Sequence, residues 1–273
     1  MAGNFKPMFW SKYCQTELRK DLILANWCDY QFEGEIKKAG SRLKIVGAVR
    51  PTIQKYTGED LKIEKLGDNS QYLDITESDA FAFEVDDIDE AQSMPGYLET
   101  QFDESKAALA ESADAFVGKQ AAKANKDMIS ASIDINNVES FLDPIDAAHV
   151  KLYENNVSQK TELAADLPPK YIVKMRKELA ELFTDNVEFI KRGALGKYAN
   201  TYLRMSNNLY DDGTDIFGMV RTKKAIAFAG QINKLKTAER EKGFGTIIKG
   251  LHVYGAKVVR PKELYVIKVK KAS

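Results

Sequence analysis

The sequence has little of what metal centres and catalytic sites are usually built from. Its two cysteines, Cys14 and Cys28, and its two histidines, His149 and His252, cannot complete a standard zinc site without a carboxylate or a second chain. Neither histidine lies in a His-Glu-x-x-His helix, and no Gly-x-Ser-x-Gly elbow occurs. We therefore interpret both histidines as structural and both cysteines as reduced thiols, and we expect neither an enzyme nor a metal site.

Two further segments resemble ligand sites only superficially. Glycines are frequent over residues 243–255, but Leu251 stands where a Walker loop needs lysine. In the same segment, Ile248 stands where a dinucleotide-binding loop needs its third glycine. The acidic run over residues 84–90 lacks the glycine and the distal glutamate of a calcium loop. We expect no cofactor, and we interpret residues 84–90 as a solvated acidic edge.

Long apolar runs and net charge are also missing. No stretch approaches the roughly 18 apolar residues of a membrane span, so we expect no membrane contact. Lys plus Arg number 40, as do Asp plus Glu, which removes any global attraction to nucleic acid. Residues 1–10 contain no apolar core of a signal peptide, which favours a protein that stays in the cytoplasm where it is made. With 273 residues, 44% of them hydrophobic, the chain can bury a core in one large domain or two lobes.

The neutral total hides a strong asymmetry of charge along the chain. Residues 59–114 hold 17 acidic and 3 basic side chains, whereas residues 191–273 hold 18 basic and 6 acidic ones. The first region is therefore near −14 and the second near +12. Each charged stretch taken alone is typical of a solvated face. Together they favour head-to-tail attraction between copies of the chain, which produces rings or lattices.

Hydrophobic periodicity predicts a mixed α+β protein. The alanine-rich stretch 97–125 has apolar residues at helical spacing and follows a Met-Pro-Gly breaker, so it predicts one long helix of roughly 40 Å. Residues 41–85 alternate in short runs and predict hairpins that need another surface to lie on. A short amphipathic helix is expected over 9–24, a second helix over 143–155 with Asp143 as its cap, and a third over 176–183. Strands are expected at 41–46, 52–57, 61–66, 72–75, 80–85, 171–173, 201–205, 225–230, 246–259 and 263–269.

Several segments resemble one family of viral shell proteins. Residues 225–234 (AIAFAGQINK) and 241–264 (EKGFGTIIKGLHVYGAKVVRPKEL) are similar to the C-terminal end of tailed-bacteriophage major capsid proteins. Residues 193–196 (GALG) with 205–208 (MSNN) resemble a second family segment, although Asn200 stands where the family usually has glycine. Residues 81–89 (FAFEVDDID) are also similar, so the resemblance covers nearly the whole chain.

The resemblance implies the α+β Hong Kong 97-like capsid fold. It implies an N-terminal arm over 1–33, an extended β-hairpin loop over 34–78 and an axial domain over 130–225. Residues 79–129 and 226–273 would form the peripheral domain, with a spine helix over 97–125. Contacts between subunits are then expected to involve Trp10, Arg50, Tyr56, Leu61, Lys62 and Ile63.

The function that follows from the resemblance is that of a major capsid protein. Copies would form hexamers and pentamers of an icosahedral phage head and enclose double-stranded DNA, which a neutral chain would contact weakly. Scaffolding, portal and decoration proteins of the same phage would be partners, and assembly would take place in the bacterial cytoplasm before the protein resides in the virion. Two alternatives remain open at this point: the shell of an encapsulin-type cellular nanocompartment, and an unrelated α+β enzyme or binding domain.

Overall fold

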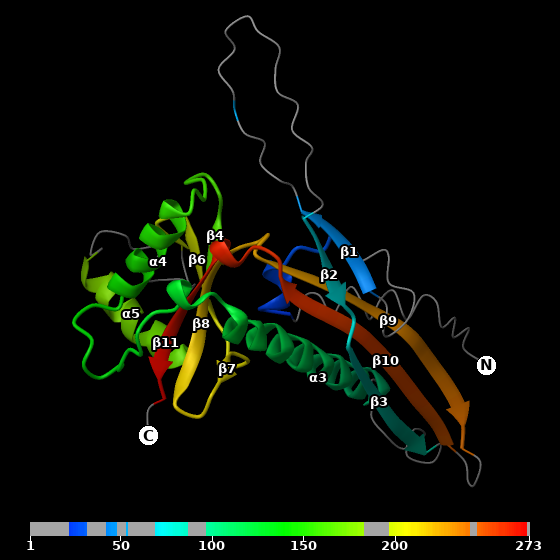
Figure 1. Cartoon of the computed structure of the whole chain (residues 1–273). Helices are drawn as coiled ribbons and strands as arrows, with labels where there is room; N and C mark the ends of the chain where they lie inside the picture. The colour runs from blue at the N-terminus through cyan, green and yellow to red at the C-terminus, as the bar shows by residue number, and fades with distance from the viewer. Residues whose placement is uncertain are drawn as a thin grey trace, which may run out of the picture.

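The computed structural model describes residues 22–31, 42–47, 53, 69–86, 97–182, 197–240 and 245–271. These residues form an α+β protein with a long helix, α3 (Tyr97–Lys119), at its centre (Figure 1). A three-stranded sheet lies along this helix, and a six-stranded sheet with two further helices lies beyond its C-terminal end (Figure 1). Across the described ranges, no helix is long and apolar enough to span a membrane.

The three-stranded sheet and α3 bury one shared apolar core. All strand pairs of the sheet are antiparallel, in the order β3 (Glu77–Asp86), β10 (Gly245–Val258), β9 (Ile226–Glu239). The helix turns its small and apolar residues toward this core, namely Phe102, Leu109, Ala110, Ala113 and Val117. Alanines let the helix approach closely, and a Cβ on Gly118 would lie 2.5 Å from the carbonyl oxygen of Asn208. The helix expected over 97–125 therefore forms over Tyr97–Lys119 and continues as the 3-10 helix η3 (Gln120–Lys123).

The six-stranded sheet separates two cores. Its main path is β11 (Leu264–Lys270), β8 (Asp215–Thr222), β4 (Leu163–Leu167), β6 (Thr201–Met205), β5 (Lys197–Tyr198), and β7 (Tyr210–Asp211) pairs with β8. Only β4 and β6 run parallel. Alternation in β11 places Leu264 and Val266 in the core of α3, and Tyr265, Ile267 and Val269 in a second core. Helices α4 (Asp143–Glu154) and α5 (Pro169–Leu182) cover that second core.

The predicted hairpin region begins as an antiparallel pair. Strand β1 (Arg42–Gly47) pairs with β2 (Asn69–Asp74), so residues 48–68 connect two neighbouring antiparallel strands. We name this pair the hairpin base. The predicted need for a second surface is confirmed, because the hairpin base packs on β9 and β10 through a third apolar cluster. The strand predicted over 72–75 begins earlier, because β2 already starts at Asn69.

In the segment 163–183, the predicted strand is wrong and the strand that does form was not predicted. Residues 171–173 are not a strand but part of α5, because Pro169 fits a first helical turn and Tyr171, Ile172 and Met175 then share one buried face. The strand of this segment is β4, which lies before the prolines and is buried along its whole length. Full burial removes the alternation that reveals a strand in the sequence.

Other differences concern caps and strand partners. Helix α4 has Leu142 at its N-cap position with no side-chain hydrogen bond, so Asp143 lies in the first turn and is not the cap. Strand β8 was not expected, and β9 extends far past residue 230. Within residues 226–273, β9 and β10 lie in the three-stranded sheet along α3. Strand β11 pairs with β8 in the six-stranded sheet, because its two apolar faces fit between two cores.

Some predictions fall outside the described residues. The helix expected over 9–24 lies almost entirely there, as do the strands expected at 52–57 and 61–66 and the cysteine Cys14. The division of the chain into arm, loop, peripheral domain and axial domain stays a prediction.

Candidate functional site

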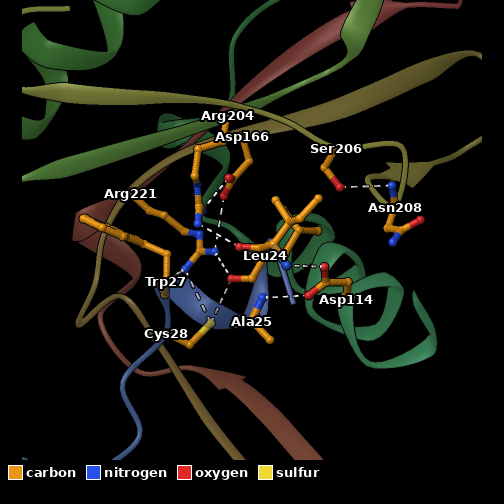
Figure 2. Close-up of polar contacts among 11 residues, drawn as sticks. Leu24, Ala25, Trp27, Cys28, Asp114, Asp166, Arg204, Ser206, Asn208 and Arg221 are labelled. Atoms are coloured by element: carbon orange, nitrogen blue, oxygen red, sulfur yellow. Dashed lines mark hydrogen bonds and ion pairs between the residues drawn. The ribbon is translucent and has the colours of Figure 1, made fainter. Parts of the chain in front are cut away.

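The N-terminal segment Leu22–Tyr30, which we call the strap, lies between α3 and the six-stranded sheet (Figure 2). Its apolar side chains Leu22, Leu24, Ala25 and Cys28 are all at most 4% exposed and belong to the core of α3. A short 3-10 helix, η1 (Ala25–Trp27), forms its middle. Inside the strap, the Trp27 and Cys28 amides bind the carbonyls of Leu24 and Ala25. Other buried amides and carbonyls of the strap need partners from neighbouring elements.

The amides of the strap are bound by one carboxylate of the long helix. Asp114 on α3 is 2% exposed and accepts hydrogen bonds from the Ile23 amide at 2.7 Å and the Ala25 amide at 2.8 Å. Burial raises the pKa of Asp114, and the two amide hydrogen bonds act against that shift. The carboxylate therefore caps the 3-10 turn from outside the strap and attaches it to α3.

The carbonyls of the strap are bound by two arginines of the six-stranded sheet. Arg221 on β8 donates from Nη2 to the carbonyl oxygen of Leu24 at 2.7 Å and from Nη1 to that of Trp27. Arg204 on β6 donates from Nη1 to the carbonyl oxygen of Ile23 at 2.7 Å. Figure 2 shows these contacts on the face of the strap turned away from Asp114. The turn thus lies with its amides toward an anion and its carbonyls toward two cations.

A buried aspartate joins the two arginines. Asp166 on β4 contacts Arg204 Nη2 at 2.5 Å through Oδ1 and Arg221 Nη2 at 3.2 Å through Oδ2. The side chains of Asp166 and Arg221 are 0% exposed and that of Arg204 is 19% exposed. We call these three residues the charge cluster. Two guanidiniums and one carboxylate leave one excess positive charge, which the strap carbonyls solvate in place of water.

The pKa directions follow from this burial. Burial lowers the pKa of Arg204, and Asp166 acts against the shift. Burial also acts to lower the pKa of Arg221, but Cys28 and Asp166 beside it leave that pKa raised. Burial raises the pKa of the Cys28 thiol, whose Sγ receives a contact from Arg221 Nη1 at 3.5 Å. Both arginines are cations, because a guanidinium stays protonated in proteins.

Sequence reasoning missed every member of the charge cluster. A usable signal exists, because Asp166 interrupts the apolar strand 163–167 and Arg221 ends the apolar run 216–220. A single charge inside a buried strand implies a buried partner. The sequence does not reveal which partner, since Asp166 and Arg221 meet only through the pairing of β4 with β8.

The predicted interface residues Trp10, Arg50, Tyr56, Leu61, Lys62 and Ile63 all lie outside the described residues. Both histidines are buried. The imidazole of His149 is within 2.6 Å of the Thr201 hydroxyl, and burial lowers the pKa of His252 to about 4. Among the described residues, no group of three or more histidine, cysteine or acidic side chains could hold a metal ion.

The described surface also carries part of the predicted charge asymmetry. A groove of about 520 Å³ runs between α3 and β3, with Asp79 and Glu104 in its lining. Glu111 lies seven residues after Glu104 on the exposed side of α3. The basic region includes Lys223 and Lys224, which form the turn from β8 to β9 beside a cleft of about 500 Å³. Neither lysine makes an ion pair with any described residue.

Comparison with known proteins gives matches in structure only. No protein-family model matches the chain, and no curated protein sequence does. A structure from Mycobacterium phage Che8 is 25% identical, with a TM-score of 0.66 and coverage of 90% of each chain. The capsid structure of the cyanophage P-SCSP1u is 17% identical, with a TM-score of 0.62 over 86% of this chain and 85% of that one.

A cellular source also provides a structural match. A virus-like particle from Pyrococcus furiosus is 11% identical, with a TM-score of 0.59 over 96% of this chain and 98% of that one. The similarity to the three structures covers 86–96% of this chain. The chain therefore has the Hong Kong 97-like α+β fold of tailed-phage major capsid proteins.

Proposed function

We propose that the chain is the major capsid protein of a tailed bacteriophage and builds the icosahedral head shell around double-stranded DNA. The observation that carries this proposal is the match to phage capsid structures over 86–92% of the chain. Its role is then structural and not catalytic, and its place is the virion after assembly in the bacterial cytoplasm. Scaffolding, portal and decoration proteins are the further partners of such a subunit.

A nanocompartment shell is the second candidate, because the particle from Pyrococcus furiosus shares the fold. The two functions differ in their cargo. Particles purified from the native source contain double-stranded DNA if the phage proposal is right, and a packaged enzyme if the second candidate is right. Nuclease-protected DNA of defined length therefore supports the first, and DNA-free particles with a stoichiometric cargo protein contradict it.

Shell assembly requires contacts that are individually weak and collectively strong. The chain connecting β1 and β2 can add contact area on a neighbouring subunit, while the hairpin base stays packed on its own subunit. The acidic face of α3 and the basic C-terminal region provide a second, electrostatic contact between copies. Several slightly different subunit angles are then compatible with the same pair of surfaces.

The hairpin can be tested without disturbing its base. Gly47 and Asn69 are register partners at the end of the β1–β2 pair, so an Asn-Gly turn can replace residues 48–68. We expect this variant to unfold at the same temperature as the unaltered subunit and to form no closed shells by electron microscopy. Normal shells from the variant would contradict the role given to the hairpin.

The electrostatic contact can be tested by charge exchange. Glu104→Lys with Glu111→Lys, and separately Lys223→Glu with Lys224→Glu, are each expected to reduce the yield of shells at least tenfold. Combining the two pairs in one chain is expected to restore assembly, because complementary charges return at the contact. Raised salt should weaken assembly of the unaltered protein. Failure of the combined variant to recover would mean that these surfaces do not meet.

A further inference from the structure

The strap connects two parts of the subunit that are otherwise separate sheets. The amides of Ile23 and Ala25 are bound by Asp114 of α3, which packs on the three-stranded sheet, and Asp29 pairs with β9 of that sheet. The carbonyls of Ile23, Leu24 and Trp27 are bound by the six-stranded sheet through Arg204 and Arg221. Any rotation of one sheet relative to the other therefore stretches hydrogen bonds on one side of the strap or the other.

The charge cluster lies where the chain crosses between these sheets. Arg221 is the second-to-last residue of β8, and the chain passes from β8 to β9 within a few residues. The chain crosses back to the six-stranded sheet between β10 and β11. This segment is bound to the end of β8, since the Thr222 hydroxyl lies 2.5 Å from Glu263 Oε2. The Arg260 amide adds a 3.1 Å hydrogen bond to the carbonyl of Ala225. Both crossings between the two sheets are thus joined beside Arg221.

The contact to the strap is directional in a way that apolar packing is not. The guanidinium of Arg221 is planar and binds two strap carbonyls and Asp166 at once. Ammonium or apolar side chains cannot reproduce three fixed directions. Full burial excludes water as a substitute partner, so small changes in angle are costly.

We propose that Arg221 is a positioning residue that acts through the strap to set the angle between the two sheets, and thereby the size of the shell. This inference rests on the proposed function, because the sheet angle is expressed as the curvature of the assembly. Loss of Arg221 leaves Asp166 paired with Arg204 alone, which is a neutral pair, so the variant removes the strap contacts without leaving an unpaired charge.

The test compares Arg221→Met and Arg221→Lys with the control Arg260→Met. Arg260 lies near the same crossing but is exposed and contacts Glu263 at 2.9 Å. The first measurement is hydrogen exchange of the Ile23 and Ala25 amides, which bind Asp114 and not the arginine. We expect exchange at least about tenfold faster in Arg221→Met, a smaller increase in Arg221→Lys, and no change in the control. Amides of β8 and β11 should keep their protection in all three.

The second measurement is the distribution of shell diameters by electron microscopy. We expect Arg221→Met to give several diameters where the unaltered protein and the control give one. Released strap amides with a single, unaltered diameter would overturn the inference and leave the proposed function intact. Absence of shells from the unaltered protein would instead overturn the proposed function.

A second variant covers the case in which Arg221→Met does not fold. Asp114→Asn removes one acceptor from the opposite side of the strap and leaves the charge cluster untouched. Faster exchange at Ile23 and Ala25 together with broadened diameters supports the inference. Unaltered exchange or unaltered diameters contradicts it.

Discussion

The strap and the hairpin base are attached to the rest of the subunit by different forces. The strap is held by buried charges and backbone hydrogen bonds from Asp114, Arg204 and Arg221. The hairpin base is held mainly by apolar side chains, with Leu43, Ile45, Leu73 and the adjacent Ile75 packed on Ala227, Ala229 and Val253. Two hydrogen bonds add to this packing, from Gln71 Nε2 to the Val259 carbonyl and from Lys257 Nζ to the Tyr72 carbonyl. Both segments are N-terminal to the long helix, and both rest on the sheets that form the body.

Of the two attachments, that of the strap fixes an angle and that of the hairpin base does not. Apolar packing depends on area and shape and has no preferred direction, so the hairpin base can adjust slightly at little cost. Buried charged hydrogen bonds lose strength steeply with direction and leave costly unpaired groups when broken. A shell subunit needs both properties, with adaptable contacts toward neighbours and a defined body.

The largest expected effect is at the centre of the charge cluster. Asp166→Asn removes the carboxylate that lies between the two largely buried arginines of the charge cluster. We expect a loss of roughly 3–5 kcal/mol in the free energy of unfolding, because uncompensated buried charge remains. Urea unfolding measures this, with Glu111→Gln on the exposed side of α3 as control. A loss below about 1 kcal/mol would contradict the description of the strap side as electrostatic.

The next effect is on the hairpin side. Leu73 is 0% exposed in the apolar cluster under the hairpin base, so Leu73→Ala should cost about 2–4 kcal/mol and speed amide exchange in β1 and β2. Leu73→Met should cost less than about 1.5 kcal/mol, because volume is kept and direction does not matter. The comparison fails if the methionine variant is as damaging as the alanine variant, or if the strap amides also exchange faster.

The third effect is a dependence of stability on pH, which arises because His252 is buried as a neutral imidazole. His252 on β10 is 2% exposed, and burial lowers its pKa from 6.5 to about 4. The unfolded chain therefore binds a proton below pH 6.5 that the folded protein does not bind until about pH 4. Stability should fall across this window as pH decreases, by up to on the order of 3 kcal/mol.

Substitution of the imidazole isolates that contribution. Unfolding of the unaltered protein and of His252→Gln is measured between pH 7 and pH 4, where carboxylates contribute equally to both. The unaltered protein should lose more stability than the variant. If the free energy of unfolding fell equally with pH in both proteins, burial would not lower the pKa of His252.

The smallest expected effect is at the rim of the hairpin base. Arg42 contacts Asp74 at 2.7 Å, but the two side chains are 66% and 51% exposed. Arg42→Met should change stability by no more than about 1 kcal/mol, because water screens the pair. A double-mutant cycle with Asp74→Asn measures the pair directly, and a coupling above about 2 kcal/mol would show that the hairpin side also depends on charge.

The sequence predicted those elements whose signals are local. The helix over 97–119 is free of proline and rich in alanine, and β10 and β11 alternate or carry long apolar runs, so each was predicted in place. Strand β4 could not be recognised by alternation, because all five residues are buried. The prolines before Tyr171 fit a strand boundary as well as a helix start, and only the shared buried face of α5 decides between them.

The charge cluster could not be predicted because its members meet through tertiary pairing. Asp166, Arg204 and Arg221 come from three strands, and two of these strands run parallel to each other. Their common partner, the strap, is about 180 residues away from Arg204, since Arg204 binds the carbonyl of Ile23. A single charge within an apolar strand indicates that a buried polar or charged partner exists. Only the order of the strands in the folded sheet shows which residue that partner is.

The most direct test of the account is electron microscopy of the purified 30.6 kDa protein over a range of concentrations. The account predicts closed icosahedral shells, with subunits joined in hexamers and pentamers. A protein that remains a monomer or a small oligomer at every concentration would contradict it.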